Sequence, residues 1–199
     1  MATFNVQDPN FEAAVRESFE HLTLMQTIGA RLRRIAPGEV EIALPFRDDL
    51  TQHHGFLAAA VLTAIADVAC GYAAMSLMPA GASVLTVEYK VNFVSPARGE
   101  RMVARSRVLK AGQTLSVCSG NVFAQTEGGE KLVATMLATI MMVRPDLDVR
   151  REERSQREHQ HHRPGAPAPA HSHRTSRPWC LCRGGGLRQT LRELAGIRR

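Results

Sequence analysis

A single carboxylate lies in the middle of the most apolar stretch of the chain. Between Asp49 and Glu88, the one fully charged side chain at neutral pH is that of Asp67. An unpaired carboxylate in apolar surroundings costs several kcal/mol unless it is hydrogen-bonded or protonated. A role as acid, base or nucleophile is one reason for a protein to keep it there. The stretch itself predicts a long helix, because small and apolar residues recur at spacings of three and four: Leu57, Val61, Ala64, Ile65, Val68 and Tyr72.

Two other interpretations of this stretch stay open. Asp67 could lie on a solvated stripe of an amphipathic helix, although residues 55–78 contain no other charged side chain with which to form one. The stretch is also about long enough to span a membrane. The central Asp67, the nearby hydroxyl residues Thr63 and Ser76 and the strand-like sequence that follows argue against a membrane span.

The positive charge of the chain is confined to its C-terminal segment. Residues 1–145 contain 13 basic and 13 acidic side chains, whereas residues 146–199 contain 12 and 6, so the net charge of +6 belongs to the second segment. That segment is rich in His, Pro and Arg and has almost no apolar periodicity. We therefore predict a folded domain over 1–145 and a basic, disordered tail over 146–199. The neutral domain gives no reason to expect a nucleic-acid partner.

The N-terminus and the cysteines indicate where the protein works. No basic segment followed by an apolar one, as in a secretory signal, begins the chain. The four cysteines do not form a Cys-x-x-Cys pair with distant histidines, which disfavours a zinc site and a disulfide framework. We expect a cytoplasmic protein with reduced thiols and no bound metal.

The sequence before the central stretch predicts one helix and one hairpin. Residues 9–24 place apolar side chains at helical spacing. Residues 28–35 and 39–44 alternate between apolar and polar positions on either side of Pro37-Gly38, which is typical of two strands joined by a turn.

The sequence after the central stretch predicts four strands joined as a meander. Leu85, Val87, Tyr89, Val91 and Phe93 alternate with Thr86, Glu88, Lys90 and Asn92, which predicts a strand over 85–93 with one apolar face. Short turns then connect strands predicted over 101–109, 114–124 and 131–143. The whole order predicts an α+β domain in which an antiparallel sheet packs on the long helix.

Several short motifs in this order of elements resemble those of a known family. They are Gln52, His54-Gly55-Phe56, Ala66-Asp67 and Ser95-Pro96-Ala97. Over about residues 10–145 the chain resembles the PaaI-like (phenylacetate-degradation) hotdog-fold thioesterases. In that family an antiparallel sheet wraps around a long central helix, two chains pair into one continuous sheet, and acyl-CoA binds at the dimer interface. The resemblance implies an acyl-CoA thioesterase that works as a homodimer or homotetramer without a metal or organic cofactor.

The resemblance also implies catalytic roles for four residues. Asp67 takes the position of the helix carboxylate that acts as nucleophile or general base, and these two routes stay open. Gln52 and Thr86 take the positions of groups that place the attacking water or the carboxylate. The backbone N–H of Ala59 takes the position of the donor that holds the developing oxyanion, with help from the helix dipole.

The sequence departs from the family at Ala58-Ala59-Ala60, where many members have His-Gly-Gly. An alanine N–H can still donate a hydrogen bond, but alanine restricts φ, so a loop shape that requires glycine would be lost. Other residues are expected to bind substrate, including polar side chains suited to the phosphates and pantetheine of CoA: His54, Gly55, Lys90, Asn92 and Arg98.

Two other functions on the same fold stay open. The run of three alanines would suit a non-catalytic acyl-CoA binder or ligand sensor. Hotdog hydratases resemble each other in an Asp followed by a Gly or Pro and a His on the hydratase helix, and here no His follows Asp67 on its helix. Only a hydrolase would release free CoA from an acyl-CoA.

Overall fold

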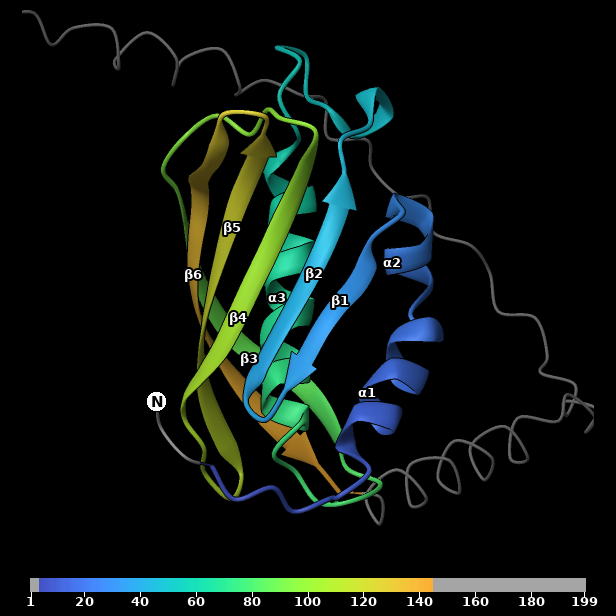
Figure 1. The fold of residues 1–199 in the computed structure, drawn as a ribbon. Helices are drawn as coiled ribbons and strands as arrows, with labels where there is room; N and C mark the ends of the chain where they lie inside the picture. The colour runs from blue at the N-terminus through green and yellow to red at the C-terminus, as the bar shows by residue number, and fades with distance from the viewer. Residues whose placement is uncertain (1–3, 145–199) are drawn as a thin grey trace, which may run out of the picture. The chain divides into compact units, whose positions relative to one another are not determined.

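A curved six-stranded antiparallel sheet packs around one long helix. The computed structural model describes residues 4–144, so the predicted tail over 146–199 lies outside the described residues. The strand order is β1-β2-β4-β5-β6-β3, and α3 (Ala59–Met75) packs against one face of the sheet. Figure 1 shows the strands curving around α3, with α1 and α2 beside β1. The predicted α+β arrangement is confirmed.

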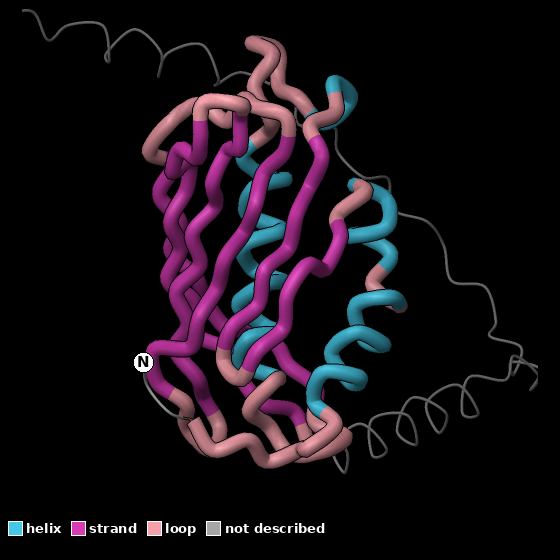
Figure 2. The backbone as a smooth tube through the Cα atoms, in the orientation of Figure 1, coloured by secondary structure: helices cyan, strands magenta, loops and turns pink. Residues whose placement is uncertain are grey.

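The remaining elements follow the predicted order along the chain. Figure 2 shows that the loops gather at the two ends of the strands. The four strands after α3 begin and end within two residues of their predicted bounds. The elements are α1 (Phe11–Glu20), α2 (Thr23–Ile28), β1 (Arg31–Ala36), β2 (Glu39–Pro45), the 3-10 helix η1 (Asp48–Leu50), β3 (Ser83–Phe93), β4 (Arg101–Lys110), β5 (Leu115–Thr126) and β6 (Gly129–Val143).

The helix predicted over 9–24 is in fact two helices, and the strand predicted from Ile28 starts later. Ile28 is the last residue of α2, and β1 begins at Arg31. Gly29 ends α2 with a φ of 77°, a left-handed conformation that glycine adopts without steric cost. The apolar residues around Ile28 fit either a short helix or a strand, and the glycine cap decides for the helix.

The predicted meander is wrong at its first turn. Within the described residues 4–144, β3 lies at the edge of the sheet and pairs only with β6, while β4 pairs with β2 and β5. The segment over 95–99 is therefore a crossing between distant strands, and its Ala97 carbonyl accepts a hydrogen bond of 3.0 Å from the N–H of Leu57 just before α3. Alternation defines the two faces of a strand but not its neighbours.

Small residues let α3 approach the sheet closely. A Cβ added to Gly120 of β5 would lie 2.9 Å from Ser106 Oγ and 3.0 Å from Cys70 Sγ, with the Ala66 carbonyl oxygen at 3.5 Å. Side chains of ordinary size on β5 would push α3 away at this point, because the interior is already close-packed. The contact lies within one residue of Asp67, so it sets the height of that carboxylate above the sheet.

A buried serine ties the end of α3 to the first hairpin. Ser76 is fully buried, and its hydroxyl donates to the Ala73 carbonyl at 2.8 Å. The same oxygen accepts the N–H of Gly38, in the β1–β2 turn, at 2.8 Å. Because the Ser76 hydroxyl both donates and accepts a hydrogen bond, its burial is not costly.

Candidate active site

Asp67 is half-buried in the middle of α3, with one hydrogen-bond partner on β3. The Thr86 hydroxyl donates to Asp67 Oδ1 at 2.8 Å. Burial raises the pKa of Asp67 above its ordinary value, and the hydrogen bond from Thr86 partly offsets the rise by favouring the charged form. A carboxyl group with a raised pKa and a fixed orientation is suited to proton transfer or nucleophilic attack.

A β-bulge in β3 turns Thr86 toward Asp67. The register between β3 and β6 shifts between Thr86 and Glu88, so Thr86 lies opposite Ile140 and Tyr89 opposite Ala138. Ile140 and Ala138 are both buried against α3. Residues opposite each other in a ladder point to the same face, so Thr86 and Tyr89 share the helix side.

The prediction of one continuous apolar face over 85–93 is therefore wrong at its beginning. Before the bulge Leu85 pairs with Met141, which places it on the face away from α3, and its side chain is 52% exposed. A bulge adds one residue to a strand and so exchanges its two faces. Perfect alternation in the sequence cannot indicate where such a residue is inserted.

Asp67 and Thr86 line a cavity of about 290 Å³ between α1, α3 and β3, which we call the Asp67 cavity. Most of its other walls are apolar, with Leu22 from the start of α2, Val68 and Met75 from α3 and Val84 from β3. A mostly apolar cavity with a few polar groups is the usual form of a small-molecule site. Its walls suit an apolar part of a small molecule.

A second cavity, of about 430 Å³, lies at the start of α3, and we call it the helix-start cavity. Gln52 and Ala59 both line it, together with Phe93 of β3. The loop that carries Gln52 is held by its own hydrogen bonds: the side-chain oxygen of Gln52 accepts the His54 N–H at 2.7 Å, and the Gln52 N–H donates to the Phe56 carbonyl at 2.8 Å.

The N-terminus of α3 presents backbone donors at this cavity. Ala58 is the N-cap residue, with no side-chain hydrogen bond to the helix, and Ala59 is the first helical residue and is exposed. The first N–H groups of a helix have no partner within it and carry the positive end of its dipole. The Ala59 N–H is thus a donor of the kind that stabilises an oxyanion.

One chain does not bring the four predicted catalytic residues together. Ala59 and Asp67 are eight residues apart on α3, which corresponds to about 12 Å along the helix axis. Neither cavity contains both groups: Asp67 and Thr86 line one, Gln52 and Ala59 the other.

The five predicted substrate-binding residues lie in three places. His54 and Gly55 are exposed in the loop before α3, where Gly55 has a φ of 75°. Arg98 is exposed in the β3–β4 connection. Lys90 and Asn92 lie opposite Leu137 and Thr135 on the face away from α3, which separates them from Asp67 of the same chain.

The two cysteines among the described residues are not nucleophiles in this structure. Cys70 and Cys118 are free and fully buried. Burial raises the pKa of Cys70 to about 11 and that of Cys118 to about 12. Both thiols are therefore protonated at neutral pH, and only a thiolate reacts readily.

The sequence did not identify three hydroxyl residues of the Asp67 cavity, which are Ser83 at the start of β3 and a pair formed by Ser18 and Tyr72. Ser18 of α1 and Tyr72 of α3 line it, and their oxygen atoms lie 3.1 Å apart. Ser18 is half-buried and follows the buried Val15 of α1 by three residues, but a single serine at such a position does not by itself indicate a ligand site. Only the packing of α1 beside α3 brings it to the site.

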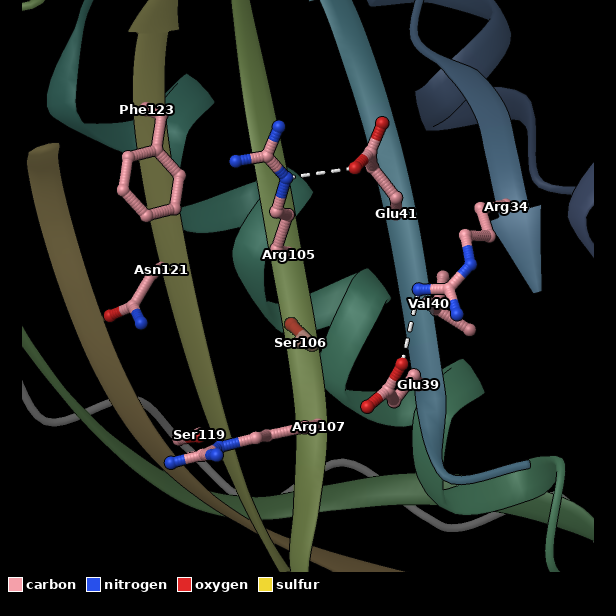
Figure 3. Close-up of a pocket in the computed structure, with 10 residues that line it drawn as sticks. All are labelled: Arg34, Glu39, Val40, Glu41, Arg105, Ser106, Arg107, Ser119, Asn121 and Phe123. Atoms are coloured by element: carbon pink, nitrogen blue, oxygen red, sulfur yellow. Dashed lines mark hydrogen bonds and ion pairs between the residues drawn. The ribbon is translucent and has the colours of Figure 1, made fainter. Parts of the chain in front are cut away.

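A separate polar depression of about 310 Å³ lies on the outer face of the sheet, with α3 behind the strands (Figure 3). At its centre Arg105 donates to Glu41 at 2.8 Å and to both oxygens of Glu130, and its guanidinium lies 5.1 Å from the centre of the Phe123 ring. The hydrogen bonds that Arg105 and Gln125 donate to Glu130 lower the pKa of Glu130 to about 2. This network links β2, β4 and β6, and the whole sheet separates it from Asp67.

The arrangement of a curved sheet around one carboxylate-bearing helix is that of the hotdog proteins, and comparison with known proteins names the family. The sequence profile of the Thioesterase superfamily matches residues 54–131. A crystal structure of a thioesterase family protein from Silicibacter pomeroyi is 47% identical, covers 67% of this chain and 98% of that chain, and superposes with a TM-score of 0.66. The chain belongs to the thioesterase superfamily.

More distant relatives agree with this assignment. A curated protein of Halobacterium salinarum, named provisionally as an esterase, is 29% identical over 125 residues, which are 58% of this chain and 80% of that protein. The E. coli PaaI protein of the phenylacetic acid degradation operon shares the fold, with a TM-score of 0.61 at 15% identity over 69% of this chain and 96% of that chain. The hotdog fold predicted from the resemblance is confirmed.

The interpretation of the central stretch as a membrane span finds no support in residues 4–144. Within that part of the chain no helix is both long and apolar enough to cross a bilayer.

Proposed function

We propose that this protein hydrolyses an acyl-CoA thioester to a free acid and CoA, with Asp67 as nucleophile or general base. The observation that carries the proposal is the Asp67 carboxylate itself, held by Thr86 at the wall of a mostly apolar cavity. Membership of the thioesterase superfamily supports hydrolysis of a thioester as the reaction class.

Each route accounts for every bond and proton. As a general base, Asp67 removes a proton from a water whose oxygen attacks the thioester carbon; the C–S bond then breaks and the CoA thiolate takes up the proton. As a nucleophile, Asp67 attacks the carbon itself, the C–S bond breaks and CoA leaves as a thiolate; water then attacks the resulting anhydride, which releases the acid and the Asp67 carboxylate, and a proton of that water goes to the thiolate. In both routes the Ala59 N–H holds the oxyanion and Gln52 positions the water or the carboxylate.

The active site in this proposal is composed of two chains. A distance of about 12 Å along α3 separates Ala59 from Asp67, so one chain supplies Asp67 and Thr86 and its partner supplies Gln52 and Ala59. Pairing of β3 with β3 of a second copy about a two-fold axis would run the two α3 helices antiparallel, and would bring the middle of one helix toward the start of the other.

Two exposed apolar surfaces support this dimer. β3 is an edge strand, and the side chains of Val87, Tyr89 and Phe93 on it are 49%, 47% and 46% exposed. Val61 and Val68 of α3 flank Asp67 and are only half-buried. Proteins cover long apolar sheet edges, because uncovered ones aggregate. The predicted contacts of Lys90, Asn92 and Arg98 with CoA belong to this two-chain site and stay predictions.

A non-catalytic acyl-CoA binder is the second candidate. Ala58-Ala59-Ala60, in place of the family's His-Gly-Gly, favours it. The two functions differ in one measurable property, which is the release of free CoA thiol.

The decisive experiment is the turnover of a panel of acyl-CoAs by the parent protein and by Asp67→Asn. The substitution keeps the size of the side chain and the hydrogen bond that Thr86 donates to it, but it removes both the nucleophile and the base. We therefore expect kcat to fall by a factor on the order of 10² or more. The variant should still bind acyl-CoA, and its melting temperature at pH 7 should not fall, because it removes a carboxylate whose charge burial disfavours. Near-normal turnover by Asp67→Asn would show that Asp67 is structural and that the proposed mechanism is wrong.

A further inference from the structure

The Asp67 cavity contains a second polar group that the proposed hydrolysis does not use. The hydroxyls of Ser18 and Tyr72 lie 3.1 Å apart and line this cavity with Asp67. Tyr72 is only 6% exposed, and its ring packs against Phe19 with the ring centres 6.0 Å apart. The packing fixes the position of the phenol oxygen.

The hydroxyl pair retains unused hydrogen-bonding capacity. Two hydroxyls carry two protons and four lone pairs, and the bond between Ser18 and Tyr72 uses one of each. Among residues 4–144 the pair makes no other side-chain hydrogen bond. Burial raises the pKa of Tyr72, so its phenol stays protonated at neutral pH. The pair can therefore both donate to and accept from a ligand.

Apart from Thr86 beside Asp67 and Ser83 at the start of β3, the rest of the cavity is mostly apolar, so a bound chain would meet its main polar contacts at Asp67 and at the hydroxyl pair. Leu22, Val68, Met75 and Val84 line the same cavity as the carboxylate and the hydroxyl pair. The volume of about 290 Å³ is at the lower end of the range for small-molecule sites. An acyl chain in this space would have its thioester carbon at Asp67 and its far end near the hydroxyls.

The spacing of the two groups indicates how long that chain is. Tyr72 follows Asp67 by five residues on α3, so their Cα atoms are about 7.5 Å apart along the helix axis, and the side chains of both residues line the same cavity. An extended chain advances about 1.2 Å per bond, so roughly six bonds are needed to cover this distance. Acetyl and other two-carbon groups end well before the hydroxyl pair.

We propose that Ser18 and Tyr72 are specificity-determining residues that select acyl chains with a hydroxyl or keto oxygen about six bonds from the thioester carbon. This inference rests on the proposed thioester hydrolysis. The selection is moderate, because the two hydroxyls already satisfy each other when a plain alkyl chain is bound. A site that leaves a buried polar group unpaired would discriminate far more strongly, by factors on the order of 10⁴.

The test uses two substrates with the same number of heavy atoms in the acyl chain: 6-hydroxyhexanoyl-CoA and heptanoyl-CoA. They differ only in a terminal hydroxyl or methyl group. The quantity measured is the ratio of their kcat/KM values for each variant, since a general loss of activity cancels in this ratio. We expect Tyr72→Phe and Ser18→Ala each to lower kcat/KM for 6-hydroxyhexanoyl-CoA, relative to that for heptanoyl-CoA, by about 5- to 10-fold. This is the effect that the loss of one hydrogen bond predicts.

Ser119→Ala is the matched control. Ser119 lies opposite Arg107 and Leu137 on the outer face of the sheet, so its loss should leave the ratio unchanged. A ratio that is the same in the parent, Tyr72→Phe and Ser18→Ala would show that the pair only holds α1 on α3, and would overturn the proposal.

Binding separates a failure of this inference from a failure of the proposed function. Calorimetry with Asp67→Asn, alone and combined with Tyr72→Phe, gives the ratio of the two Kd values without turnover. A rise in the Kd of 6-hydroxyhexanoyl-CoA relative to that of heptanoyl-CoA on removal of the phenol supports the proposal even if the parent releases no CoA. An unchanged ratio overturns it even if the parent is an active thioesterase.

Discussion

Two opposing effects set the protonation of Asp67. Burial disfavours its charge, and the Thr86 hydroxyl favours it. The carboxylate must be ionised to act as nucleophile or base, so turnover should fall as the pH drops through its pKa. Because that pKa is raised, the acid limb of the kcat/KM profile should lie above the ordinary value of about 3.9 for aspartate.

The same balance predicts the effect of removing the hydroxyl. Thr86→Val keeps the shape of the side chain but removes a hydrogen bond to the charged form, so the pKa of Asp67 should rise further and the acid limb should move to higher pH. Thr139→Val removes a hydroxyl that donates to Glu88 instead, on the outer face, and should leave the limb in place. Superimposable profiles for the parent and Thr86→Val would exclude Asp67 as the group that titrates.

The proposed oxyanion donor can be removed with a single substitution. Ala59 is the first residue of α3, a position where proline fits without breaking the helix. Ala58 has φ −62° and ψ 140°, the conformation that a following proline favours. Ala59→Pro deletes only the backbone N–H, and we expect it to lower kcat by a factor on the order of 10² to 10³.

Ala59→Gly is the matched control for the proline variant. It keeps the N–H group, so its kcat should stay near that of the parent, and circular dichroism should show both variants folded. If Ala59→Pro turns over acyl-CoA as fast as Ala59→Gly, another group holds the oxyanion.

At the scale of the elements, the contact between α3 and β5 positions the active site. Gly120→Ala would place a methyl group 2.9 Å from Ser106 Oγ and 3.0 Å from Cys70 Sγ. Overpacking of this kind costs about 1–3 kcal/mol of folding stability. We expect a lower free energy of unfolding in urea.

A second glycine serves as the control for this packing effect. Gly128, in the β5–β6 turn, has only the Thr126 hydroxyl at 3.7 Å from an added Cβ, so Gly128→Ala should change stability little. Equal stability of the two variants would mean that the close approach of α3 and β5 relaxes without cost.

The bulge in β3 is the second element-scale feature with a functional consequence. It places Thr86 and Tyr89 on one face. In a regular strand, two residues three positions apart would lie on opposite faces. The hydroxyl that holds Asp67 and the aromatic side chain at the exposed sheet edge thus both lie on the helix side. β3 contributes at once to the site and to the proposed dimer.

At the scale of the whole molecule, a two-chain active site predicts complementation. Ala59→Pro and Asp67→Asn each inactivate every site of their own homodimer in the proposed arrangement. A mixed dimer would have one intact site, with Asp67 from one chain and the Ala59 N–H from the other. Random mixing of equal amounts should therefore restore about a quarter of the parent activity.

The measurement is CoA release after the two variants are denatured and refolded together, compared with each refolded alone. Light scattering of the same samples should show dimers or larger assemblies. If mixing restores no activity, or if a monomer is active, both groups act within one chain and the two-chain site is wrong.

The sequence by itself determined the class of the fold and the central residue of the site. Alternation predicted all six strands, and helical spacing predicted the helix around Asp67, because these periodicities are local properties of each segment. A lone charge in an apolar stretch pointed to Asp67 for the same reason, since only neighbouring residues are needed to recognise it.

The tertiary structure alone decided how these pieces meet. The edge position of β3, its bulge and the placement of Ser18 beside Tyr72 depend on residues 40 or more positions apart in the chain. The left-handed Gly29 likewise shortened the first strand in a way that apolar spacing does not indicate. Periodicity specifies which face of an element is apolar, but the partner of that face is chosen by packing of the whole chain.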